Sequence, residues 1–260
     1  SLSSTGPTGR HNVLVFGLVI RSAPEGKRAY SMIIEISSQL AENGLILRGG
    51  FVFGQDEKVP AGAGDARAVL LVGHGGPTIW PHFQAWRASH SANLDDPLDT
   101  WSREVIGAVA GRFGARAVSP SDRPYLPFQQ WAMRAEGLKP SPLGILMHPE
   151  FGLWHAYRGA LLFADAQAAR EIAALPAHTP VHLCDGCDGR PCLHACPVGA
   201  YSTSGFAYER CLGHVRSDAG GACRETGCLD RMACPYGEAY RYSPAQQAFH
   251  MAAFARLAAR

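Results

Sequence analysis

All eight cysteines of this 260-residue chain lie between Cys184 and Cys234, and none lies in the first 183 residues. Cysteines that only fill a core would be scattered, so this clustering indicates one module that uses its thiols together. They form two groups of four, each closed by a Cys-Pro pair: Cys184-x2-Cys187-x4-Cys192-x3-Cys196-Pro197 and Cys211-x11-Cys223-x4-Cys228-x5-Cys234-Pro235. Thiols grouped in this way can form disulfides, bind zinc or hold iron–sulfur clusters.

Iron–sulfur chemistry explains this pattern best. Disulfides need an oxidising compartment, and no export signal is visible, so we expect a cytoplasmic protein. Two four-cysteine zinc sites are an alternative, but zinc sites do not require a proline after the last cysteine. A Cys-Pro pair that closes four cysteines resembles the bacterial-type ferredoxins, which carry two [4Fe–4S] clusters.

The ferredoxin resemblance implies a crossed set of ligands, because the fourth cysteine of each run ligates the other cluster in such proteins. One cluster would then take Cys184, Cys187, Cys192 and Cys234, and the other would take Cys211, Cys223, Cys228 and Cys196. The loops after Cys187 and Cys211 are longer than in the ferredoxin pattern. An alternative is therefore that the chain binds one cluster and that the remaining cysteines are free thiols.

Composition excludes several classes of protein. With 47% hydrophobic and 18% charged residues, the chain can bury a core and is not a disordered tail. No apolar stretch approaches the ~18–20 residues that span a bilayer, so we expect no membrane partner. The 21 arginines and three lysines are scattered, whereas a nucleic-acid surface needs them clustered, so we expect no nucleic-acid partner.

The chain before Cys184 alternates strand and helix patterns, which is typical of an α+β or α/β enzyme domain. Strands are predicted over 13–20, 45–53, 66–72 and 115–118, and helices over 30–43, 97–113, 128–136 and 243–260. The glycine-rich segment 73–77 lacks the residues of a phosphate-binding loop, so we interpret it as a strand-to-helix turn.

Several residues mark the ends of these elements. Gly44 is placed to cap the first helix, and Gly49-Gly50 is placed to form a bulge in the next strand or to allow a close backbone approach. Asp96 and Ser243 are expected to cap the helices that begin at the prolines following them. The final helix has an apolar stripe, so we expect it to pack on the main domain.

The stretch 144–163 contains two strand-like runs separated at 150–152, and we interpret it as a β-hairpin. Alternation along the second strand puts Trp154 and Arg158 on one face, with His155 and Tyr157 on the other. Arginine beside tryptophan can bind an anion while the ring stacks on a flat ligand. A purely structural arginine in a core strand is an equal alternative.

The motif His148-Pro-x-Phe-Gly-x-Trp154-x-Ala-x-Arg158-Gly resembles the cobalamin-processing family whose human member is defective in methylmalonic aciduria with homocystinuria, type C. The Asp96-Pro-x-Asp99 stretch and the terminal Tyr-Ser-x-x-Gln246 are also similar to that family. The resemblance implies a modified flavin-nitroreductase fold that removes upper-axial ligands from cobalamin. It also implies that His148, Trp154 and Arg158 belong to the cofactor site, with Arg158 at a glutathione co-substrate.

The human-type members of that family have no ferredoxin module, so the cysteine-rich segment of this chain has no counterpart in them. A nitroreductase-like domain followed by two cysteine runs is instead similar to epoxyqueuosine reductases and reductive dehalogenases, which use cobalamin with two [4Fe–4S] clusters. The combination predicts an α+β protein with a nitroreductase-like domain over 1–180, a dicluster ferredoxin module over 181–240 and a C-terminal helix over 241–260.

The predicted function is to pass electrons from a redox partner protein, through the clusters, to a corrinoid on the main domain. The catalytic residues stay undefined. The alternatives are an electron carrier without its own catalysis and a reductase that binds FMN in place of cobalamin.

Overall fold

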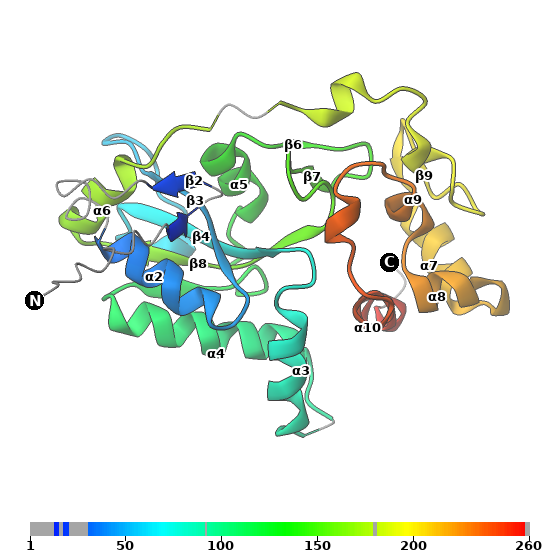
Figure 1. Ribbon diagram of the computed structural model, residues 1–260, viewed down its shortest axis with the longest axis horizontal. Coiled ribbons are helices and arrows are strands. Elements are labelled where there is room, and N and C mark those ends of the chain that lie inside the picture. Colours follow the sequence, from blue (N-terminus) through cyan, green and yellow to red (C-terminus); the bar gives the residue numbers. More distant parts are fainter. Residues whose placement is uncertain (1–12, 16–17, 21–30, 92, 179–180, 258–260) are drawn as a thin grey trace, which may run out of the picture.

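The computed structural model describes residues 13–15, 18–20, 31–91, 93–178 and 181–257. A layered body of sheet and helices occupies one side of Figure 1, and the cysteine-rich part with its short helices occupies the other. Among the described helices, none is long and apolar enough to cross a membrane.

A four-stranded antiparallel sheet forms the centre of the layered body. Its strands lie in the order β3 (Ile46–Val52), β4 (Ala68–Gly75), β8 (His155–Phe163) and β5 (Arg116–Val118). Every residue of β4 is buried, because helices cover both faces of the sheet. The antiparallel order makes this body α+β.

Helices bury their apolar stripes on both faces of the sheet. One face packs against α2 (Ser31–Ala41), α3 (Trp80–Ala88), α4 (Pro97–Arg112) and α6 (Ala166–Ala173). The other face packs against α5 (Phe128–Glu136). Short segments η1 (Ala61–Ala63), β6 (Lys139–Pro140) and β7 (Leu146–Met147) complete this body.

The cysteine-rich part consists of short elements joined by turns. They are η2 (Leu183–Gly186), η3 (Pro191–Leu193), β9 (Tyr201–Ser202), β10 (Gly205–Phe206), α7 (Tyr208–Arg216), η4 (Asp218–Gly220), α8 (Gly221–Thr226), α9 (Leu229–Met232) and η5 (Glu238–Tyr240). The chain then ends in α10 (Pro244–Arg256), which lies between this part and the sheet body in Figure 1.

Several predicted element ends are confirmed. Gly44 has φ of 69° and closes α2, with Leu45 N–H donating to Leu40 and Gly44 N–H donating to Ala41. A β-bulge lies between Leu47 and Gly50 in β3. The side chain of Ser243 accepts from Gln246 N–H and caps α10.

Other expectations are wrong. One strand was expected over 13–20, but the described residues of this stretch form two paired strands, β1 (Val13–Val15) and β2 (Leu18–Ile20). The stretch 144–163 is not a simple hairpin, because β7 pairs with β6 while β8 pairs with β4 and β5. Asp96 adopts φ of 44° and its side chain makes no cap hydrogen bond.

Candidate functional site

The eight cysteines surround two separate cavities of about 300 and 350 Å³, counting the parts open to solvent. The first is lined by Cys184, Cys187, Cys192 and Cys234, and the second by Cys196, Cys211, Cys223 and Cys228. None of the eight forms a disulfide. Each cavity therefore takes three cysteines from one run and one from the other, and the folding brings together the same sets that crossed ligation requires.

The thiols within each set influence one another. Burial is the main cause that raises the pKa of Cys184 to about 11, and the neighbouring Cys234, Cys192 and Cys187 contribute to that value. Burial likewise raises the pKa of Cys211 to about 12, with contributions from the other three cysteines of the second set. Four thiolates in either cavity would need a bound cationic centre, because their mutual repulsion otherwise favours the protonated form.

The sulfurs of each set are spread around a cavity. Among the described residues, no three or more His, Cys, Asp or Glu side chains converge as they would on a single metal ion. The sulfurs line the walls of a cavity, whereas tetrahedral zinc draws its four ligands to about 2.3 Å from one point.

The first cavity is built against the sheet body. Leu143, Met147 and Leu153 form an apolar cluster with Cys192 and Cys234, and the segment that contributes these three residues runs between α5 and β8. Apolar walls of this kind keep water from a bound centre.

Asp230 joins the two cysteine runs. It is fully buried in α9, between Cys228 and Cys234, and its Oδ1 accepts the N–H of Ala195 at 3.0 Å and of Cys196 at 2.7 Å. These bonds fix the backbone at the cysteine that crosses to the second set. No local signal in the sequence marks Asp230, because its partners lie 34 and 35 positions away.

Arg231 ties the cysteine-rich part to the sheet body. Its guanidinium carbon lies 4.4 Å from the ring centroid of Trp154 and 4.7 Å from that of Tyr242. Its Nη2 also donates to the Leu153 carbonyl at 2.6 Å. Trp154 is consequently fully buried. The expected stacking of Trp154 on a flat ligand does not fit this structure, because protein groups cover the ring.

Arg158 and His148 also have protein partners. Arg158 Nη2 donates to Asp99 Oδ1 at 2.5 Å and Nε donates to Ser102 Oγ at 3.0 Å, both on α4. His148 Nδ1 accepts the N–H of Glu150 and of Phe151, each at 3.1 Å. Each of the three residues expected at a cofactor site therefore has partners within the protein.

The His148 ring is neutral near pH 7, because its pKa lies well below that pH. Burial is the main cause that lowers the pKa of His148 to about 3, and the nearby Arg48 adds to it. His148 Nε2 lies 3.8 Å from Glu136 Oε1, but a neutral imidazole forms no ion pair there. Glu136 is instead paired with Arg48 through two hydrogen bonds of 2.9 and 3.0 Å.

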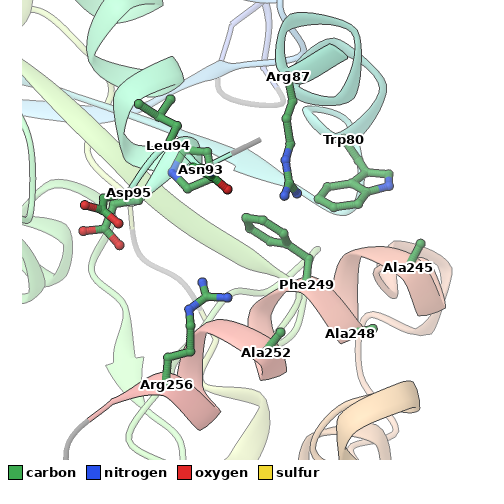
Figure 2. A pocket seen from close by; sticks show the side chains of 12 residues that line it. Trp80, Arg87, Asn93, Leu94, Asp95, Ala245, Ala248, Phe249, Ala252 and Arg256 are labelled. Atoms are coloured by element: carbon green, nitrogen blue, oxygen red, sulfur yellow. The ribbon is translucent and has the colours of Figure 1, made fainter. Parts of the chain in front are cut away.

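A groove of about 1150 Å³, counting the part open to solvent, lies between α3, the segment before α4, and α10. It combines aromatic rings, small side chains and both signs of charge (Figure 2). Its lining residues are Trp80, Arg87, Asn93, Leu94, Asp95, Asp96, Pro97, Ala245, Ala248, Phe249, Ala252 and Arg256. No local pattern in the sequence predicts this groove, because its walls come from segments far apart in the chain.

Helix α10 separates the groove from the second cysteine set. Ala248, Phe249 and Ala252 lie on its groove face, whereas Met251 lies on another face and lines the second cysteine cavity. Phe249 also packs on the sheet body, with its ring centroid 5.3 Å from that of Phe83 on α3. The helix thus contacts both parts of the molecule.

Comparisons with known proteins give a likeness of fold. No known family model and no curated protein matches the sequence. Among solved structures, the epoxyqueuosine reductase from Bacillus subtilis is 13% identical over 83% of this chain and 68% of that chain, with a TM-score of 0.49. An epoxyqueuosine reductase with a tRNA stem loop is 14% identical over 83% of this chain and 68% of that chain, with a TM-score of 0.48.

A selenomethionine-labelled epoxyqueuosine reductase is 12% identical over 84% of this chain and 69% of that chain, with a TM-score of 0.51. The stem loop belongs to the complex that contains it, and it does not test the expectation that this chain has no nucleic-acid partner. The resemblance to the cobalamin-processing family is likewise untested by these structures. The chain is therefore similar in fold to epoxyqueuosine reductase, at an identity that carries no activity across.

Proposed function

We propose that this protein is an iron–sulfur redox protein that passes electrons through two [4Fe–4S] clusters to a corrinoid on its sheet body. The observation that carries this proposal is the division of the eight cysteines around two cavities, three from one run and one from the other in each. Ferredoxin-type ligation requires that division, whereas two independent zinc knuckles would each use neighbouring cysteines.

The residues around both cavities fit a cluster. Each cavity offers four sulfur ligands and no disulfide competes for them. Asp230 holds the backbone at Cys196, and Arg231 holds α9 against Trp154, so both cysteine runs are fixed relative to the sheet body. When bound, the clusters supply one-electron redox centres whose potentials depend on burial and on hydrogen bonds to sulfur.

The groove beside α10 fits an amphipathic cofactor. Trp80 and Phe249 offer aromatic surface, while Arg87 and Arg256 offer donors and Asp95 offers acceptors. A corrinoid has a broad macrocycle and a rim of amide side chains, which need both donors and acceptors. When bound, it would supply a cobalt centre for low-potential chemistry, which the fold likeness to epoxyqueuosine reductase also supports.

The test begins with anaerobic reconstitution of the full chain. We expect about eight iron and eight sulfide per chain, and a visible spectral change when cobalamin is added to the reconstituted protein. Zinc without labile sulfide, or only about four iron, would contradict the dicluster assignment. Cluster redox without binding of any second chromophore would identify an electron carrier, and binding of FMN alone would identify a flavin reductase.

A further inference from the structure

Asp230 has an unusual position for a carboxylate, because it is fully buried and no ion pair of the described residues includes it. Its Oδ1 accepts the N–H groups of Ala195 and Cys196, whereas its Oδ2 is buried and has no hydrogen-bond partner among the described residues. Buried carboxylates are normally paired with a cation, and an unpartnered buried oxygen is a feature of redox and catalytic sites.

Asp230 lies among the ligands of the second cysteine set. It comes two positions after Cys228, and it binds the backbone N–H of Cys196 at 2.7 Å. Burial is the main cause of the raised pKa of Cys211 and of Cys223, and the charge of Asp230 contributes to both. The carboxylate therefore lies against this set and acts on all of its members that it does not touch directly.

The charged side chains nearest to the first set are at the surface. Arg190 lines the first cavity and is exposed, and Asp185, which follows Cys184, is exposed too. Asp230 also contributes to the raised pKa of Cys192, for which burial is the main cause. Water and salt screen exposed charges, whereas a buried charge acts across a medium of low dielectric constant. Of the two sets, the second therefore has the stronger negative charge beside it.

A negative charge beside a cluster stabilises the oxidised form, because reduction adds a further negative charge. Asp230 also holds the Cys196 N–H, and an N–H that donates to a carboxylate is not free to donate to sulfur. The charge around a cluster and the hydrogen bonds to its sulfurs both set its reduction potential. The two effects of Asp230 act in the same direction, and each lowers the potential.

We infer that Asp230 sets the reduction potential of the second centre, the one held by Cys196, Cys211, Cys223 and Cys228, and that its buried charge makes this centre the lower-potential one of the two. The inference rests on the proposed function and adds an electrostatic role to the backbone contact of the same residue. Electrons then pass favourably from the second centre to the first, whose cavity is built against the sheet body.

The first experiment compares the midpoint potential of the second centre with and without the charge at position 230. Asp230→Asn keeps a side-chain oxygen for the two N–H donors and removes the charge. The reconstituted full chain is titrated with reductant and followed by electron paramagnetic resonance, in the Cys234→Ser background that should retain the second centre. We expect reduction of this centre to become about tenfold more favourable in Asp230→Asn, a rise of ~59 mV for one electron.

Glu225→Gln is the matched control. It removes an equal charge from an exposed position two residues after Cys223, so the potential of the second centre should stay near the wild-type value. A merely structural Asp230 predicts no change of potential in Asp230→Asn, because asparagine can accept both of the same hydrogen bonds.

Iron and sulfide contents and circular dichroism show whether each variant is folded and loaded. If loaded Asp230→Asn keeps the original potential, or if Glu225→Gln shifts it equally, the inference is wrong and the proposed function stands. If the wild type binds zinc without labile sulfide, the proposed function fails and this inference fails with it.

A second measurement leaves position 230 unchanged. Cys234→Ser should retain the second centre and Cys223→Ser the first, so the two variants give the two midpoint potentials separately. We expect the lower potential in Cys234→Ser. An equal or higher potential in that variant would overturn the inference, whether or not Asp230→Asn folds.

Discussion

The sheet body and the cysteine-rich part are stabilised in different ways. The sheet body buries two apolar cores, one on each face of its four strands. Between residues 181 and 240, the buried apolar residues are Cys192, Ala200, Leu212, Val215, Cys223 and Cys234. Half of these six are cysteines of the two sets. We therefore expect the cysteine-rich part to depend for its stability on a centre bound by its thiols, whereas the sheet body has a large apolar core of its own.

Removal of iron and sulfide from the reconstituted protein should have the largest effect of the changes considered. It should destabilise the cysteine-rich part and leave the sheet body folded. We expect amide hydrogen exchange over 183–236 to rise by orders of magnitude, because little apolar burial remains there. Exchange in β4 and β8 should change little. Mass spectrometry of the apo and loaded proteins checks this. An equal loss of protection in β4 would show that the two parts do not differ in this way.

Single cysteine substitutions sharpen the comparison within the cysteine-rich part. Cys234→Ser should disturb the centre shared with Cys184, Cys187 and Cys192 and largely spare the other, so iron should fall from about eight to about four. Cys223→Ser should give a similar iron content with a different electron paramagnetic resonance signal. The crossed assignment fails if the two variants lose the same signal.

Loss of the Asp230 carboxylate should weaken the second set in particular. Asp230→Ala leaves the N–H groups of Ala195 and Cys196 without their acceptor, at a cost of about 1–3 kcal/mol for a buried group. Release of iron from the second centre should become faster, as followed by its spectrum in the Cys234→Ser background. Asp218→Ala, at an exposed position, is the matched control. An unchanged rate of iron release in Asp230→Ala would show that Asp230 does not position the second set.

Arg158→Ala tests whether Arg158 stabilises the sheet body or binds a ligand. Asp99 and Ser102 lose their donor, which should lower stability by about 1–3 kcal/mol. Because Arg158 does not line the groove, cobalamin affinity should stay at the wild-type value. Thermal melting and dialysis on one preparation measure both quantities. Tenfold weaker binding with an unchanged melting temperature would instead support the ligand role that the family resemblance implies.

A dependence of stability on pH is also predicted in the sheet body. Burial lowers the pKa of His74 to about 3, from about 6.5 in an unfolded chain, and its Nδ1 lies 2.8 Å from the Gly76 carbonyl. Between these values the unfolded state binds more protons, so stability falls as pH decreases from about 6.5. This one group contributes a slope of up to about 1.4 kcal/mol per pH unit.

Protection of β4 amides at pH 7 and at pH 5 measures that slope in the loaded protein. His74→Gln should reduce it, because glutamine cannot titrate. Substitution of the exposed His82 should leave it unchanged. An equal slope in His74→Gln would assign the pH dependence to other groups.

Much of the candidate metal site could be predicted from local sequence. The spacing of the cysteines and the two Cys-Pro pairs define two runs of four, and the ferredoxin resemblance implies that the runs exchange their last cysteines. The crossed sets line the two cavities. Helix ends were also predictable where one residue supplies the conformation, as Gly44 does with its positive φ. Whether the sets bind clusters remains a prediction, since ligation is a property of the loaded protein.

Other features depend on contacts between distant segments and have no local signal. Arg158 was expected at a ligand, but α4 places Asp99 and Ser102 against it. The Trp154 ring is covered because Arg231 lies 77 positions further along the chain and folds back over it.

The sequence by itself therefore determined that the cysteines form one region and that strands alternate with helices before it, because both follow from residue type and spacing. Only the tertiary structure decided which polar groups are paired and where a groove is left open. Trp80, Asp95 and Phe249 become neighbours around that groove because α10 packs between the sheet body and the second cysteine set.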